Sequence, residues 1–178
     1  MIDFKRMAPQ DIKDVAGQLE TARAELIAVV STLTEEQART RPAPDRWSVL
    51  ECLEHVNSVE RRFLRMVRES ESRPPAERDA AKETALMERV TDRRNRRTAP
   101  EAVHPVGRYR SISEALRDFN AARDETLRFA SEEGVNLLSR SARHLAFGPL
   151  NGVETLLLIG FHGRRHTAQM RRKVGNGA

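Results

Sequence analysis

The chain has 178 residues, which is long enough to bury one hydrophobic core, and we expect a single domain over residues 1–178. Hydrophobic residues make up 39% of the chain and charged residues 32%, a balance typical of a globular protein with a charged surface. Aromatic residues make up only 4%, and runs of β-branched residues are scarce, so we expect helices rather than sheets.

Neither a signal peptide nor a membrane span is predicted. The first six residues carry charges where a signal peptide would need an apolar stretch. The longest apolar run, residues 153–161, contains Glu154 and is about half as long as a membrane span requires. The single cysteine, Cys52, excludes an internal disulfide and suits a reducing compartment. We therefore expect a cytoplasmic protein.

The formal net charge is +5, from 31 basic and 26 acidic residues that are interleaved along the chain. The densest basic cluster is Arg93-Arg94-Asn95-Arg96-Arg97. It offers charges for nucleic-acid phosphates, but no aromatic residues lie between the arginines to stack on bases. Scattered charge is more typical of a solvated surface, so nucleic acid is not expected to be the main partner.

The first half of the chain predicts two long helices. The first spans about residues 12–33, where apolar residues recur at spacings of three and four: Ile12, Val15, Leu19, Ala22, Leu26, Val29 and Leu33. A capping box over residues 34–37 opens a short helical turn, and the prolines of residues 41–45 break the chain. A second capping box, Ser48 to Glu51, starts another helix with the same spacing, which ends near residue 70.

The second half of the chain predicts two more long helices. Residues 70–110 are interpreted as a long connection that crosses the bundle, with a short peripheral helix within residues 76–92. A third capping box, Ser111 to Glu114, starts the next helix, and Gly134 is a natural stop. After a loop over residues 135–150, the last helix runs from a cap at Asn151 to about Lys173. The prediction is an all-α four-helix bundle with a long crossing connection between helices 2 and 3.

Three histidines indicate that this bundle binds a metal ion. His162 and His166 are four residues apart, so on a helix both imidazoles point from one face and can converge on one ion. His55 borders the apolar stripe of the second helix. A lone histidine there is more often a packed side chain than a ligand, but a bundle core is where facing helices build metal sites. Imidazole ligands suit zinc, nickel, copper or iron rather than magnesium or calcium.

The sequence from Trp47 to Val56, together with Gly148-Pro149-Leu150 leading into His162 and His166-Thr167-Ala168-Gln169, resembles the DinB-like (DinB/YfiT) superfamily. The resemblance covers essentially the whole chain and is weakest over residues 70–110. It implies a four-helix bundle, often a homodimer, that holds a divalent metal through one histidine of the second helix and the pair on the last. Carried over to this sequence, the ligands are His55, His162 and His166.

Three protein ligands leave a position for water or substrate, as in catalytic rather than structural metal sites. The resemblance implies a metal-dependent hydrolase or a transferase that activates a low-molecular-weight thiol, and no residue separates the two. The alternative is a non-catalytic, stress-associated metal-binding module.

Glu51 lies one turn before His55 and is a candidate catalytic base, although a capping role explains it equally well. The remaining candidates have simpler interpretations, with Cys52 as a core residue, Gln169 as a polar edge, Trp47 as a packing anchor, and His104 and His144 as loop residues.

Overall fold

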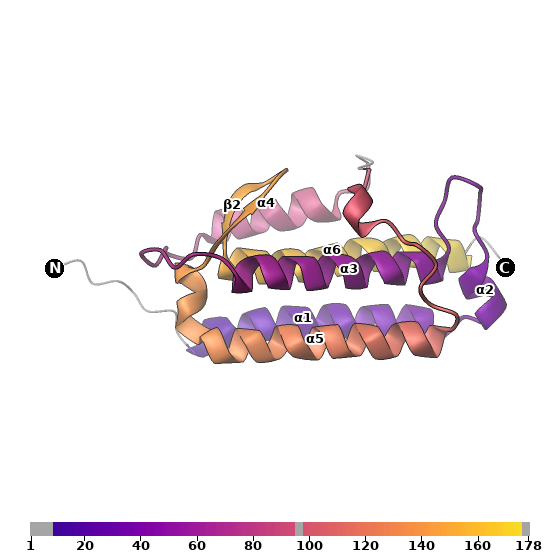
Figure 1. Cartoon of the computed structure of the whole chain (residues 1–178), viewed down its shortest axis with the longest axis horizontal. Helices are drawn as coiled ribbons and strands as arrows, with labels where there is room; N and C mark the ends of the chain where they lie inside the picture. Colours follow the sequence, from indigo (N-terminus) through magenta and orange to yellow (C-terminus); the bar gives the residue numbers. More distant parts are fainter. Residues whose placement is uncertain (1–8, 95–97, 176–178) are drawn as a thin grey trace.

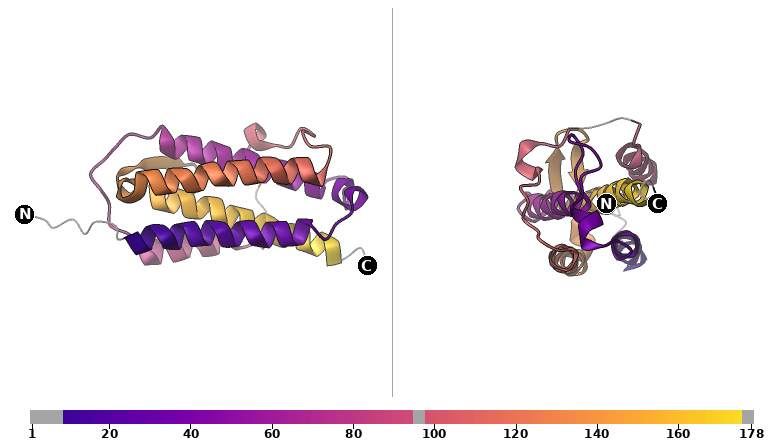
Figure 2. Two further views of the ribbon diagram at one scale, coloured as in Figure 1. Left: turned by 90° about the horizontal axis from the view of Figure 1, so that it is seen from below. Right: turned by 90° about the vertical axis from the view of Figure 1, so that its right-hand side faces the viewer.

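Four long helices form the body of the molecule: α1 (Pro9–Val30), α3 (Val49–Arg68), α5 (Ile112–Glu133) and α6 (Gly152–Gly175). In this computed structural model, which describes residues 9–94 and 98–175, α1 and α3 each pack against both α5 and α6. Figure 1 shows that α1 and α6 run in one direction and α3 and α5 in the other. The end-on view of Figure 2 shows the four helices around a common core. The predicted four-helix bundle is therefore confirmed.

Parts of the sequence interpretation lie outside the described residues. These are the charged N-terminus over residues 1–6, residues 95–97 of the arginine cluster, and the side chains of Ile12 and Lys173. No helix in the part of the chain that is described is both long and apolar enough to cross a membrane.

The helix starts follow the predicted caps closely. Ser48 accepts a hydrogen bond from the backbone N–H of Glu51, and the Glu51 carboxylate accepts one from the backbone N–H of Ser48. Two reciprocal hydrogen bonds of the same kind, between Thr34 and Gln37, start the short α2 (Glu35–Arg39). The third box is only half formed, because Glu114 accepts from the backbone of Arg110 instead of from Ser111. At α6, Asn151 and Glu154 cap one another as predicted.

The connection between α3 and α5 carries the chain back along the bundle, so that α5 starts at the same end as α3 (Figure 1). Its peripheral helix, α4 (Ala80–Thr91), packs against α6 and buries Leu86 and Val90. A 3-10 turn, η1 (Glu101–Val103), follows. The predicted crossing connection and its short helix are both observed.

The prediction of a loop over residues 135–150 was wrong, because the segment contains regular structure. This segment contains a 3-10 helix, η2 (Gly134–Ser139), and an antiparallel hairpin of β1 (Ser141–His144) and β2 (Gly148–Asn151). Each strand has four residues and no clear apolar alternation, so the sequence carries little strand signal. Beyond the pairing of its two strands, the hairpin packs against α3, since the rings of Phe63, His144 and Phe147 contact one another in series.

A buried ion pair lies in the middle of the bundle. Arg123 of α5 is 0% exposed and donates to both carboxylate oxygens of Glu60 of α3, at 2.8 and 2.9 Å. Thr126 also donates to Glu60, and Arg123 donates to the carbonyl of Leu19 on α1. Buried charges of this kind are tolerated only when they are fully paired. The network therefore joins three of the four helices at fixed positions.

Candidate metal centre

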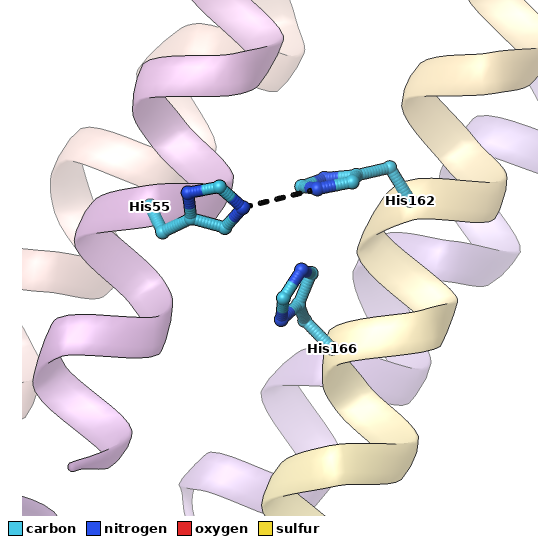
Figure 3. Close-up of side chains that lie close together, drawn as sticks. All are labelled: His55, His162 and His166. Atoms are coloured by element: carbon cyan, nitrogen blue, oxygen red, sulfur yellow. Dashed lines mark hydrogen bonds between the residues drawn. The ribbon is translucent and has the colours of Figure 1, made fainter. Parts of the chain in front are cut away.

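Three histidines from two helices meet inside the bundle. His55 projects from α3, and His162 and His166 project from α6 toward it (Figure 3). One ring nitrogen of each lies within 4.8 Å of the other two, and the ring centroids are 4.6 to 5.0 Å apart. The two α6 histidines are one turn apart, so they share the face that packs on α3.

The ring of His55 is oriented by a backbone carbonyl. Its Nδ1 atom lies 2.8 Å from the carbonyl oxygen of Val103 in η1. A carbonyl only accepts, so Nδ1 carries the proton and the neutral ring keeps a lone pair on Nε2. That Nε2 atom lies 3.2 Å from Nε2 of His162. This outer hydrogen bond is the arrangement that usually fixes a metal-ligating histidine.

One pair of these nitrogens already has the spacing expected around one cation. Two nitrogens bound tetrahedrally to one zinc ion, at about 2.0–2.1 Å each, lie about 3.3 Å apart. The observed separation of 3.2 Å between His55 and His162 is close to that value. The Nδ1 atom of His166 is buried and has no hydrogen-bond partner among the described residues. A buried polar atom without a partner is costly, and an ordered water beside the ring would relieve that cost.

Burial keeps the three imidazoles neutral. His55 is 4% exposed and His166 is 8% exposed, whereas His162 remains partly exposed. Desolvation lowers the pKa of His55, and desolvation together with the neighbouring histidines lowers the pKa of His162 well below its usual value. Desolvation, followed by the charge of His55, lowers the pKa of His166 to about 3. Neutral imidazole is the form that binds a metal, so these rings can bind a cation at neutral pH without first losing a proton.

Aromatic packing closes one side of the cluster. The ring of Trp47 lies 4.8 Å from the ring of His55, centroid to centroid, and 5.8 Å from the ring of His104. His104 is exposed and bonds the carbonyl of Ala99, so it lies on the outer side of Trp47. The predicted packing role of Trp47 is thus observed, and its packing surface includes the candidate ligand itself.

Glu51, the predicted catalytic base, lies at the N-terminal end of α3 with both carboxylate oxygens occupied. One accepts from the backbone N–H of Ser48 at 2.7 Å, and Arg41 bonds both. Burial alone would raise the pKa of Glu51, but the bonds from Arg41 and Ser48 outweigh it and the pKa is lowered. The geometry favours the capping role, and a catalytic role for Glu51 stays a prediction.

Glu54 lies beside the candidate ligand His55 and has a supporting role that the sequence interpretation missed. It is 2% exposed, and its carboxylate accepts three backbone N–H bonds, from Val106, Gly107 and Arg108, at 2.9 to 3.0 Å. These donors follow directly after the segment that contains Val103. Glu54 therefore fastens the connection to α3 beside His55. Its position between Leu53 and His55 carries no signal of this role, because its partners lie more than 50 residues away in the sequence.

The other candidates from the sequence lie outside the cluster of three imidazoles. Cys52 is buried with the apolar core, as expected for a core residue. His144 packs in the hairpin between Phe63 and Phe147. Gln169, one turn after His166, contributes a hydrogen bond that opposes the lowering of the His166 pKa.

A surface cavity of about 830 Å³ lies between the C-terminal end of α1 and the start of α5. Its lining residues include Val30, Ile112 and Leu116, and none of the three histidines. This cavity therefore has no part in the candidate metal centre.

A helical bundle with three inward imidazoles on its second and last long helices is the combination that the motif resemblance implies. Residues 18–170 match the family model described as the DinB superfamily. The chain belongs to this superfamily.

Two individual proteins are similar over most of the chain. The uncharacterized protein YuaE of Bacillus subtilis (strain 168) is 25% identical over 150 residues, which cover 84% of this chain and 91% of YuaE. The solved structure of YfiT from Bacillus subtilis matches with a TM-score of 0.58 at 15% identity, over 98% of this chain and 94% of YfiT. YfiT is described as a probable metal-dependent hydrolase with an unusual four-helix bundle topology. At this identity the likeness to YfiT establishes the fold.

Proposed function

We propose that this chain is a metal-dependent enzyme that binds one divalent transition metal through His55, His162 and His166 and acts on a small molecule. The observation that carries the proposal is the convergence of three imidazole nitrogens within 4.8 Å, with His55 oriented by Val103. Zinc, nickel and iron suit this set of ligands. Three protein ligands leave room for a further one, which is the feature that separates catalytic from structural sites.

Hydrolysis is the first candidate reaction, supported by the description of YfiT as a probable metal-dependent hydrolase. A bound divalent cation would lower the pKa of a coordinated water from about 16 toward ~7. In this chain the imidazoles hold the cation, while Val103 and Glu54 keep the first imidazole in place. Trp47 shields that imidazole from solvent on one side.

Transfer of a low-molecular-weight thiol is the second candidate, and one observation favours it. The carboxylates nearest to His55 in sequence, Glu51 and Glu54, are both occupied by hydrogen bonds. A thiol requires no carboxylate base, because the charge of a metal stabilises the thiolate directly. A non-catalytic metal-binding module is the remaining alternative.

Cobalt substitution tests these alternatives. We expect the cobalt-loaded protein to change its visible spectrum when azide or a small thiol such as cysteine is added, because an open position accepts an added ligand. The same titration on His104→Ala, which alters an exposed histidine outside the cluster, should give the same change. A spectrum that responds to neither azide nor thiol would contradict the catalytic proposal and favour the non-catalytic module.

A further inference from the structure

The outer face of α1 and α5 is an uncovered side of the bundle. α4 packs against α6, and the hairpin of β1 and β2 packs against α3 and α6. Between η2 at one end and α2 at the other, no other described element lies along the outer face of α1 and α5 (Figures 1 and 2). The surface cavity of about 830 Å³ opens on this face, and its half-buried lining includes Leu33, Ile112 and Leu116. Apolar surface is therefore open to a partner here.

Charged side chains run in a line along this face of α5. Arg117, Asp124 and Arg128 are spaced by seven and four residues, so they lie on one side of the helix, and all three are exposed. The side chain of Asp124 is 67% exposed and accepts a hydrogen bond from Arg23 through its Oδ1 atom. Among the described residues, Arg117 and Arg128 make no ion pair. Two cations and a carboxylate are thus presented to solvent along one line.

The line of charges is complementary to a second, reversed copy of itself. When two α5 helices pack antiparallel about a two-fold axis beside Asn120 and Ala121, position 117 of each helix lies opposite position 124 of the other. Arg117 then meets a carboxylate. Position 128 lies opposite Ser113, so no like charges face one another along the line. Ala121 is exposed and small, so the two helices can approach closely at the axis.

The same arrangement would cover the cavity. Ser113 follows Ile112, whose backbone N–H donates to both carboxylate oxygens of Glu35 at 3.0 and 3.2 Å. These three residues line the cavity. The partner's Arg128, opposite Ser113, would lay its apolar stem over Ile112 and extend its guanidinium toward Glu35. A second pair of opposite charges would thus form between the copies.

We propose that the outer face of α1 and α5 joins two copies of this chain in a symmetric dimer, with Arg117 of each copy paired to the partner's Asp124. The charges favour a second copy over an unrelated protein, because this face carries both members of the pair at positions that a two-fold axis brings together. The dimer goes beyond the proposed function and is independent of it, since the three histidines lie between α3 and α6, outside this face.

Sedimentation equilibrium of the full chain at low ionic strength tests the dimer. We expect the unmodified chain to be dimeric. Arg117→Asp and Asp124→Arg each place like charges at both symmetric contacts, so each should weaken the dimer by about tenfold or more. The matched control is Arg62→Asp, which reverses an exposed arginine on α3 and should leave the dimer unchanged. A monomeric unmodified chain, or a dimer that neither charge reversal weakens, would overturn the inference.

An equal mixture of the two variants tests the register of the pairing. The aspartate introduced by Arg117→Asp then faces the arginine introduced by Asp124→Arg, and the unchanged Arg117 and Asp124 face one another at the second contact. We expect the mixture to dimerise, although each variant alone does so weakly. Both substitutions are at exposed positions, and recovery in the mixture also shows that both variants are folded. A mixture that stays monomeric would overturn the pairing of Arg117 with the partner's Asp124.

Discussion

Nδ1 of His55 donates to the carbonyl oxygen of Val103 at 2.8 Å, which links the proposed ligand on α3 to a turn 48 residues further along the chain. Glu54 holds the same connection through the backbone N–H groups of residues 106–108. The orientation of the imidazole thus depends on a carboxylate that does not touch it.

The first prediction concerns Glu54→Gln. Glutamine has one acceptor oxygen, so it cannot satisfy three backbone donors, and its NH₂ group repels them. We expect the turn at Val103 to loosen and the metal affinity to fall by about 10- to 100-fold, as for other changes in the groups that orient metal-ligating histidines. Competition with a chromophoric chelator measures the affinity.

The control for this prediction is Glu51→Gln, which changes the neighbouring carboxylate one turn earlier. Glutamine also serves in a capping box, so we expect only a small loss of stability and an unchanged metal affinity. Equal effects of the two substitutions on metal affinity would show that Glu54 has no special role in orienting His55. If Glu51 is instead the general base predicted from the sequence, its substitution would lower the rate of hydrolysis by about 100-fold or more at full metal content.

The second prediction concerns the pH dependence of the metal-free protein. The pKa of His166 is about 3 in the folded chain and 6.5 in the unfolded chain, so between these values the unfolded chain binds more protons. Stability is therefore fully present above about pH 6.5 and falls as the pH falls toward about 3. Inside this window His166 contributes a slope of up to about 1.4 kcal/mol per pH unit.

Urea unfolding of the metal-free protein at pH 7, 6 and 5 measures this slope. We expect His166→Gln to reduce it by the contribution of one proton. A slope that is the same in the unmodified chain and in His166→Gln would contradict the burial of a neutral His166.

The third prediction concerns the start of α6. A Cβ atom at Gly152 would lie 2.5 Å from the carbonyl oxygen of Leu137 in η2, which is a backbone atom and cannot swing away. We expect Gly152→Ala to lower the free energy of unfolding by about 1–3 kcal/mol, the usual cost of overpacking. At Gly160 the nearest atom would be Leu19 Cδ2 at 3.7 Å, an ordinary contact. Gly160→Ala should therefore be neutral or stabilise by up to about 1 kcal/mol through helix propensity. Thermal melts compare the Gly152→Ala and Gly160→Ala variants. Equal Tm values for the two variants would refute the close contact at Gly152.

Much of this fold could be predicted because its signals are local. The apolar stripe through Val15, Leu19 and Leu26 is buried as its spacing indicated, and the caps at Ser48 and Asn151 start the helices as predicted. A four-residue spacing places His162 and His166 on one face of any helix. Such features depend on residues within one or two turns, so the sequence displays them directly.

The features that were missed depend on distant partners. Glu54 and Glu60 are each 2% exposed, but the groups that pair with them come from residues 106–108 and from Arg123. From the neighbouring residues in the sequence, neither glutamate can be told apart from a glutamate on a solvated helix face. The hairpin over residues 141–151 was missed because its two short strands show no apolar alternation, and one of its packing partners, Phe63, lies on α3. The single domain, the homodimer, the cytoplasmic location and the minor role of nucleic acid stay predictions.

Metal content tests the central claim most directly. Elemental analysis of protein purified without a nickel column should find about one transition-metal ion per chain, and none in His55→Ala, His162→Ala or His166→Ala. His104→Ala should keep the full content, because that imidazole is exposed outside the cluster. Retention of the metal by His55→Ala would contradict the claim that α3 and α6 together bind one cation.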